Sequence, residues 1–152
     1  PDCKVCGCGA YGCLEAYASR TAVAKDILAD LNRGGDSMIR DKVDMTKGIL
    51  RSKAISQAVL AGDEMVTSAV EHAAKCMATG LVSVINFLNP QRIIMGGGLI
   101  EAVPRYFEIV DIYTKRRCLK IPSRKIEIMR AELGDYAGII GAAMLSKNGS
   151  GK

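Results

Sequence analysis

A glycine-spaced cluster of cysteines near the start of the chain constrains its fold more than any other feature. The thiols follow C-x-C-x₄-C spacing and belong to Cys6, Cys8 and Cys13. The glycines between them permit the tight turns, with positive φ, that such a loop requires. Zinc binds about four ligands, usually thiolates and imidazoles, in a tetrahedron. The segment therefore predicts a metal-binding loop that has three of its ligands in place.

The residues alone leave the fourth ligand open. Cys3 stands at C-x-x-C spacing from Cys6 and is the nearer candidate. His72 is the one histidine of the chain, and its place in a helical pattern favours an ordinary helix residue. A glycine-rich turn with incidental cysteines is the competing interpretation, which the density of thiols disfavours. A disulfide framework is disfavoured because we expect a cytoplasmic protein, whose thiols stay reduced.

The composition is that of a globular domain without a membrane segment. Of the 152 residues, 49% are hydrophobic and 24% charged, which excludes a disordered chain. No apolar run approaches the roughly 20 residues that span a membrane, and no secretory signal opens the sequence. The chain begins only a few residues before the cysteines, and we expect an earlier part of the protein to be absent.

Basic residues gather late in the chain and contribute to its net charge of +5. They are Lys115, Arg116, Arg117, Lys120, Arg124 and Lys125. A nucleic-acid patch is one interpretation. We favour a solvated helix end, because cations suit a helix C-terminus and neither a recognition helix nor an aromatic platform accompanies the cluster.

The apolar periodicity predicts a helix-rich α/β chain. Apolar residues at three- and four-residue steps predict helices over 14–33, 54–61, 64–88, 102–117 and from 134 onward. Ser19 is expected to break or re-cap the first helix, and Asp63 to cap the third. Short apolar runs predict buried parallel strands over 92–95 and 125–129. Gly80 lies inside the third helix, which indicates close packing or a nearby ligand.

The predicted elements resemble one half of an α/β layered domain. Two parallel strands make a poor sheet, because parallel sheets are normally buried on both faces. We therefore expect further strands to precede Pro1. The longest helix offers an apolar stripe that runs through Val66, Val70, Ala73, Met77, Leu81, Val84 and Leu88. The last helix carries apolar residues at Ile139, Ile140, Ala143 and Met144.

One stretch of the chain, residues 6–19, reads Cys-Gly-Cys-Gly-Ala-Tyr-Gly-Cys-Leu-Glu-Ala-Tyr-Ala-Ser. It closely resembles the signature C-x-C-G-x-x-G-C-x-E-x-x-x-[S/G] of the ROK family, which comprises bacterial sugar kinases and sugar-responsive repressors. Every fixed position of the signature is met. The resemblance continues through residues 61–63, 86–90, 93–98, 133–138 and 141–143, so it covers nearly the whole chain.

The resemblance implies an α/β, helix-rich part of an actin-like ATPase (ribonuclease H-like) domain. Residues 1–152 would form the C-terminal domain of a ROK-type sugar kinase, with the zinc loop and signature over residues 1–19. The three loop cysteines would hold a structural zinc. In the family the fourth ligand is an upstream histidine, which would fall before Pro1, and Cys3 stands where the family usually has a non-ligand residue.

The resemblance also implies two ligand contacts. Glu15 matches the family carboxylate that accepts hydrogen bonds from sugar hydroxyls. The alternative is an acidic residue favoured in the first turn of a helix. The run of Gly96, Gly97 and Gly98 matches the adenosine-side nucleotide contact, with a plain turn as the alternative. Gly80 would border the same nucleotide cleft.

The function that the resemblance implies is an ATP-dependent hexose kinase that phosphorylates glucose, uses ATP with Mg²⁺, and forms a homodimer. The family's Asp-x-Gly-Gly-Thr phosphate loop, its Asn-Asp sugar motif and its catalytic aspartate belong to the first half. This sequence contains none of them, so no catalytic residue is assigned and the chain alone is expected to be inactive. A sugar-sensing domain of a ROK repressor, which would bring in nucleic acid as a partner, is the second hypothesis. A zinc-stabilised interaction module is the third.

Overall fold

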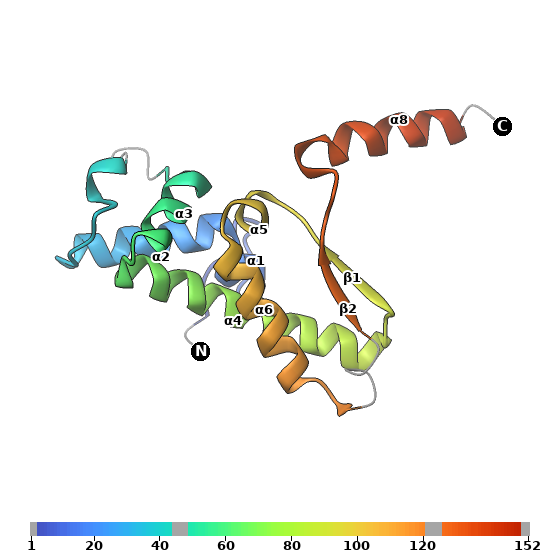
Figure 1. Cartoon of the computed structure of the whole chain (residues 1–152), viewed down its shortest axis with the longest axis horizontal. Coiled ribbons are helices and arrows are strands. Elements are labelled where there is room, and N and C mark those ends of the chain that lie inside the picture. The colour runs from blue at the N-terminus through green and yellow to red at the C-terminus, as the bar shows by residue number, and fades with distance from the viewer. Residues whose placement is uncertain (1–2, 44–48, 121–125, 150–152) are drawn as a thin grey trace.

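The computed structural model describes residues 3–43, 49–120 and 126–149, and within them it is helix-rich and α/β as predicted (Figure 1). Helices are labelled α, strands β and 3₁₀ turns η. In chain order they are α1 (Glu15–Ala18), α2 (Arg20–Asn32), η1 (Arg40–Lys42), α3 (Ser52–Leu60), α4 (Glu64–Leu88), β1 (Arg92–Met95), α5 (Gly98–Ala102), α6 (Pro104–Arg117), β2 (Glu127–Arg130), η2 (Gly134–Tyr136) and α8 (Ala137–Gly149).

Two side-chain caps set helix boundaries where the sequence predicts them. Ser19 has an extended backbone between α1 and α2, and its Oγ accepts a hydrogen bond from the Ala22 N–H (3.1 Å). Asp63 precedes α4, and its Oδ1 accepts a hydrogen bond from the Val66 N–H (3.0 Å). Each cap supplies an acceptor for one of the N–H groups that a first helical turn leaves unpaired.

The long helix α4 is central to the fold, because α1, α2, α3 and α6 all pack against it. Its buried residues are Val66, Ala69, Val70, Ala73, Ala74, Ala78 and Ile85. The apolar stripe seen in the sequence also includes Val84 and Leu88, and both of these are exposed, Leu88 at 64%. Periodicity identifies the apolar face of a helix, but burial requires a neighbour, and no described element covers that side of the last turns.

The sequence predicts a helix over 102–117, which corresponds to α6, and the structure has a further short helix, α5, before it. Val103 separates them with φ −119° and ψ 87°, because a residue before proline is disfavoured in the helical region. Pro104 occupies the first turn of α6, where proline is favoured because the N–H that it lacks would be unpaired there anyway. Before α5, Gly97 adopts a φ of 108°, a conformation that glycine reaches without steric cost, so that helix begins directly after β1.

The strands β1 and β2 pair in parallel, with Ile93 opposite Ile128 and Ile94 opposite Met129. Strand β2 begins at Glu127, and the predicted first strand residue, 125, lies outside the described residues. Ile128 is buried, whereas Ile94 and Met129 on the other face are exposed. One face of the sheet therefore lacks a cover among the described residues.

The C-terminal helix α8 stands away from the rest of the molecule (Figure 1). The 3₁₀ turn η2 opens it at Gly134, close to the predicted start. Its apolar side chains are exposed, Ile139 at 70% and Met144 at 61%. Across the described ranges, no helix is long and apolar enough to cross a membrane.

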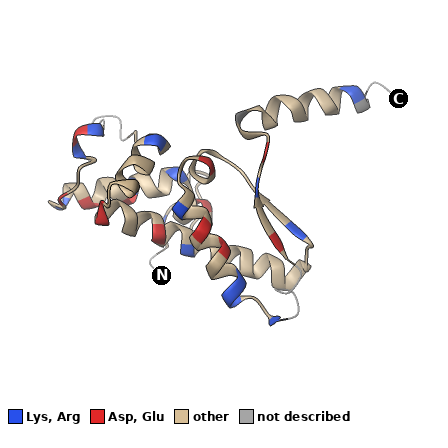
Figure 2. Ribbon diagram, viewed as in Figure 1, with Lys and Arg blue, Asp and Glu red and all other residues tan. Residues whose placement is uncertain are grey.

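Basic side chains mark the C-terminal end of α6 (Figure 2). Lys115 Nζ lies 2.7 Å from Oδ1 of Asp111, one turn earlier. The Arg117 guanidinium lies 5.8 Å from the ring centroid of Tyr113. Two members of the predicted basic cluster, residues 124 and 125, lie outside the described residues. These contacts hold Lys115 and Arg117 against their own helix.

Candidate functional site

The cysteine loop is a tight antiparallel hairpin. Val5 and Tyr11 form a β-bridge. The Cys6 N–H donates to the Ala10 carbonyl (2.8 Å), and the Gly12 N–H donates to the Lys4 carbonyl (3.1 Å). Two of the loop glycines have positive φ, 87° at Gly9 and 76° at Gly12. These are the turns that the glycine spacing predicts.

The hairpin brings the three predicted metal ligands together. The Sγ atoms of Cys6, Cys8 and Cys13 all lie within 4.8 Å of one another, and the Cys8 and Cys13 sulfurs are 3.7 Å apart. Thiolates that bind a tetrahedral zinc at about 2.3 Å are separated by about 3.8 Å. The spacing and chemistry of this donor set therefore fit a zinc ion.

The thiols of the cluster differ in acidity. A backbone hydrogen bond at Ala10 and then the Cys6 side chain lower the pKa of Cys8. Hydrogen bonding to Cys8 and then to Cys6 raises the pKa of Cys13 to about 11. A metal ion requires its cysteine ligands as thiolates. Cys8 is therefore the member that ionises more readily than Cys13.

Three further cysteines and the histidine lie outside this group. Cys3 is exposed on the first strand of the hairpin. His72 is exposed on α4, and its Nε2 lies 3.8 Å from Cys76 Sγ. Burial raises the pKa of the Cys118 thiol and is also the main cause of the raised pKa of Cys76. Both thiols are thus disfavoured as thiolates.

Glu15 stands directly beside the cysteine cluster. It is the first residue of α1 and is exposed, and its Oε2 accepts a hydrogen bond from the Cys6 thiol over 3.9 Å. Sulfur is a weak donor, so this contact orients the carboxylate without sequestering it. The structure thus joins the predicted sugar contact to the predicted metal loop.

A cavity of about 280 Å³, which we call the polar cavity because charged residues contribute to its lining, opens beside Glu15. Sequence reasoning missed its other charged lining residues, Lys4, Lys25 and Asp26. Lys4 Nζ lies 2.6 Å from Asp26 Oδ1, between the hairpin and α2. This ion pair joins residues that are 22 positions apart, so no local pattern in the sequence predicts it. Cations and carboxylates around one cavity provide both donors and acceptors for a hydroxylated ligand.

The glycine run follows the carboxyl end of β1. A Cβ added at Gly96 would lie 3.2 Å from the Ala131 side chain, and one at Gly98 would lie 3.4 Å from Ser52 Oγ. Gly97 adopts the positive φ described above and has open space around it. The run therefore lets the backbone turn tightly and leaves it accessible at Gly97.

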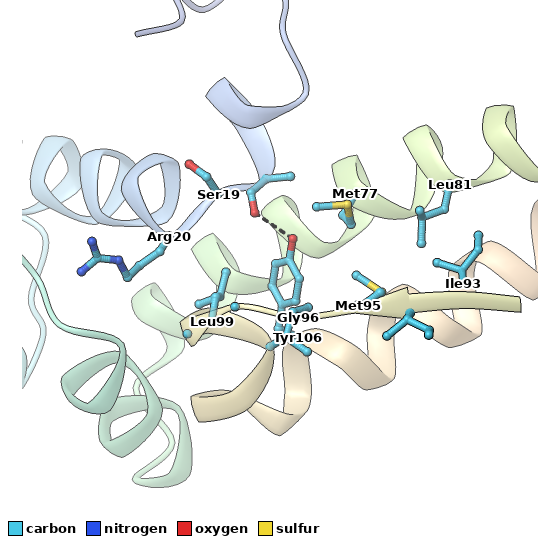
Figure 3. A pocket seen from close by; sticks show the side chains of 14 residues that line it. Ser19, Arg20, Met77, Leu81, Ile93, Met95, Gly96, Leu99 and Tyr106 are labelled. Carbon is cyan, nitrogen blue, oxygen red and sulfur yellow. Dashed lines mark hydrogen bonds between the residues drawn. The ribbon is translucent and has the colours of Figure 1, made fainter. Parts of the chain in front are cut away.

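A second, apolar cavity of about 410 Å³ lies against this glycine run (Figure 3). Met77 and Leu81 of α4 face Ile93 and Met95 of β1 across it. Tyr106 of α6 forms another wall, and its hydroxyl donates to the Ala18 carbonyl (2.7 Å). Sequence reasoning missed these walls because they come from segments distant in the chain.

Gly80 has a packing role and does not line the apolar cavity. A Cβ at this position would lie 2.7 Å from Leu14 Cδ2, closer than side chains tolerate. The absence of a side chain lets the start of α1 approach α4. Of the two predicted explanations, close packing is therefore confirmed, and Gly80 is not among the residues that line the cavity beside the glycine run.

The two cavities adjoin at the junction of α1 and α2. Ser19 lines both of them, and the backbone on either side leads to Glu15 in one direction and to Arg20 in the other. The arrangement sets a polar cavity with a carboxylate next to an apolar cavity with a glycine turn.

The chain resembles known proteins over nearly its whole length. It is 30% identical over 142 residues to a glucokinase of Halalkalibacterium halodurans, covering 93% of this chain and 43% of that enzyme. It is 29% identical over 142 residues to the DNA-binding transcriptional dual regulator NagC of Escherichia coli (strain K12), covering 93% of this chain and 33% of that regulator. The relatives thus include both enzymes and regulators, and the chain spans less than half the length of each.

The fold of the chain is also similar to that of a solved structure. A ROK family glucokinase from Streptomyces griseus, in complex with glucose and AMPPNP, matches with a TM-score of 0.78 at 28% identity, over 95% of this chain and 47% of that one. This confirms the helix-rich α/β class and its relation to the actin-like ATPase fold. The ROK family profile itself matches residues 1–149, and the chain belongs to the ROK family.

Proposed function

We propose that this chain is the C-terminal domain of an ATP-dependent hexose kinase that acts on glucose. The observation that carries the proposal is the adjacency of the two cavities at Ser19. One offers a carboxylate among charged neighbours, and the other offers apolar walls beside a glycine turn. A kinase has to place a sugar and a nucleotide side by side, and this junction suits that task.

The sugar would lie in the polar cavity with its hydroxyls donating to Glu15. An ionised carboxylate is a strong acceptor for such hydroxyls. Lys4 and Asp26 line the same space and are held by their own ion pair. The glucokinase structure that contains glucose supports this assignment by similarity.

The adenosine part of ATP would lie in the apolar cavity. Ligand pockets for flat aromatic groups are lined mostly by apolar side chains with a few polar groups, which describes the walls formed by Met77, Leu81 and Met95. Gly97 lets the backbone approach the nucleotide closely. AMPPNP in the related glucokinase supports ATP, with its Mg²⁺, as the second substrate.

A zinc ion held by Cys6, Cys8 and Cys13 would have a structural role. When bound, it would cross-link the hairpin that leads directly into α1. Glu15 is the first residue of that helix, so the loop would fix the position of the sugar-binding carboxylate. No reaction step is assigned to the ion.

Phosphoryl transfer needs more than these two cavities. It depends on Mg²⁺, a phosphate-gripping loop and an oriented nucleophile, and the family motifs for these functions do not occur in this sequence. We propose that the chain by itself is inactive. Glucose, Mg-ATP and an ADP-coupled assay test this directly, and clear turnover by the isolated chain would contradict it.

The second candidate is a sugar-sensing domain of a ROK repressor. NagC is nearly as similar to the chain as the glucokinase is, over a stretch of the same length. Nucleotide binding distinguishes the two, because only the kinase hypothesis gives the apolar cavity a nucleotide. We also propose that the chain forms a homodimer. Size-exclusion chromatography with light scattering, which measures the molar mass in solution, checks this.

Amide NMR spectra, recorded during separate titrations with glucose and AMPPNP, test the proposed function. We expect glucose to shift resonances around residues 4–22 and AMPPNP to shift those around residues 93–100. Shifts with glucose and none with AMPPNP would favour the sensor. No shift with either ligand would favour an interaction module and contradict both ligand-binding proposals.

A further inference from the structure

Arg20 is the one charged side chain among the described residues that line the apolar cavity. It is the first residue of α2 and directly follows Ser19, which lines both cavities. In the close view of the cavity Arg20 lies at one end, whereas Leu81 and Ile93 lie at the opposite end (Figure 3). An arginine at one end of a mostly apolar cavity suits a ligand that has an apolar part and an anionic part.

The guanidinium of Arg20 is anchored but not neutralised. Its Nη1 donates to the Leu50 carbonyl over 3.4 Å, which is a long hydrogen bond from one of the five N–H donors of the group. No carboxylate of the described ranges forms an ion pair with it, whereas Arg33 at the other end of α2 pairs with Asp30 at 2.9 Å. Arg20 is also exposed, so its charge and most of its donors are available to a ligand.

The other cations near the junction of the two cavities are placed differently. Lys4 and Lys25 belong to the lining of the polar cavity. Lys4 Nζ is held by Asp26, whose Oδ1 lies 2.6 Å away. Arg20 is therefore the cation that the fold sets beside the junction on the side of the apolar cavity.

The proposed kinase function determines where the phosphates of ATP have to lie. The terminal phosphoryl group is transferred to a sugar hydroxyl, so the phosphates have to extend from the apolar cavity toward the polar cavity. Their path passes the junction at Ser19, next to Arg20. A guanidinium binds phosphate oxygens through two parallel hydrogen bonds, and a cation that holds the transferred group stabilises the charge of the transition state.

We propose that Arg20 binds the terminal phosphates of ATP at the junction of the two cavities. The inference rests on the proposed kinase function and goes beyond it by assigning a phosphate-binding residue to this chain. The hydrogen bond to Leu50 would hold the guanidinium in place, and its other donors would point to the nucleotide.

Calorimetric titrations of the chain with adenosine, AMP and AMPPNP in the presence of Mg²⁺ test the assignment. Arg20→Gln is expected to bind AMPPNP at least about tenfold more weakly than the unmodified chain, as for the loss of a hydrogen bond to a charged group. It should bind adenosine and AMP with unchanged affinity. Arg20→Lys keeps the charge and should recover part of the loss. Arg33→Gln is the matched control and should bind all three ligands like the unmodified chain.

The Nε–Hε resonance of Arg20 gives a second measurement that needs no mutation, and we expect it to shift with AMPPNP and not with adenosine. A loss of adenosine affinity in Arg20→Gln equal to the loss for AMPPNP would overturn the phosphate contact, because the side chain would then only support the cavity wall. An equal loss for AMP and AMPPNP would overturn the assignment to the terminal phosphates.

Two further outcomes separate this inference from the proposed function. Unchanged AMPPNP affinity in Arg20→Gln, beside clear binding by the unmodified chain, would overturn the role of Arg20 and leave the kinase proposal intact. An unmodified chain that binds none of the three ligands would overturn the nucleotide site and the role of Arg20 together.

Discussion

Two parts of the molecule are both rich in apolar residues, yet they differ in burial. One is the body built around α4 (residues 3–117), and the other is the C-terminal arm of η2 and α8 (residues 134–149). Ile27, Val66 and Val70 in the body are fully buried, whereas the apolar residues of α8 are exposed and the helix stands apart (Figure 1). The outer face of the sheet resembles α8 in this respect, with Ile94 and Met129 exposed. An apolar pattern specifies a helix or strand, and packing partners decide how much it stabilises the fold.

The largest difference between body and arm is expected from an isoleucine in each. Ile27→Ala removes a fully buried side chain from α2 and should lower the free energy of unfolding by about 2–5 kcal/mol. Ile139→Ala in α8 should change it by less than about 0.5 kcal/mol, the usual range for surface positions. Urea denaturation measures both. Similar losses in the two variants would mean that α8 packs against the body.

A second comparison of the body with the arm removes the hydroxyl of one tyrosine in each. Tyr106→Phe removes a buried donor to the Ala18 carbonyl and should cost about 1–3 kcal/mol, the penalty for an unpaired buried polar group. Tyr136 is exposed in η2, so Tyr136→Phe should leave the unfolding free energy nearly unchanged. A neutral result for Tyr106→Phe would show that the hydroxyl does not tie α6 to α1.

The smallest expected effect concerns two glutamates in ion pairs and depends on pH. A hydrogen bond from Arg105 is the main cause of the lowered pKa of Glu71. A carboxyl whose pKa is lower in the folded state stabilises the fold above its unfolded pKa, and this contribution is lost as pH falls through the folded value. Glu71→Gln should therefore cost under about 1 kcal/mol at pH 7 and progressively less below pH of about 4.

Glu127 in β2 is the matched control, because it pairs with Arg92 in an exposed ion pair. Glu127→Gln should have a smaller effect on stability at pH 7 than Glu71→Gln. Denaturation curves at several pH values check both variants. A cost of Glu71→Gln that does not change between pH 7 and pH 3 would count against the ion pair as its cause.

Local chemistry explains which parts of the fold are predictable from the sequence. Ser19 and Asp63 act as caps through their own side chains, and the pattern of polar and apolar residues around them is enough to identify both. The short helix α5 ends where the predicted helix over 102–117 begins, and the sequence analysis does not predict it. The exposure of Leu88 could not be predicted, because it depends on what lies beside the helix.

The candidate site divides in the same way. The three cysteines, Glu15 and the glycine run occur in short motifs, so neighbouring residues in the sequence are enough to identify them. Lys4 and Asp26 meet across 22 positions, and Tyr106 reaches Ala18 across 88. Contacts of that range depend on the tertiary fold, so the cavity walls that they form become visible only in three dimensions.

The central claim is that Glu15, which lies beside the metal loop, binds a sugar. Calorimetric titration of the zinc-loaded chain with glucose tests this claim most directly. Glu15→Gln keeps the shape of the side chain and removes its charge. Glu64→Gln is the matched control, because Glu64 is also exposed and also the first residue of a helix. We predict saturable binding by the unmodified chain and by Glu64→Gln, and an affinity at least about tenfold weaker for Glu15→Gln, as expected for a hydrogen bond to a charged group. Equal glucose affinity in all three proteins would contradict the account.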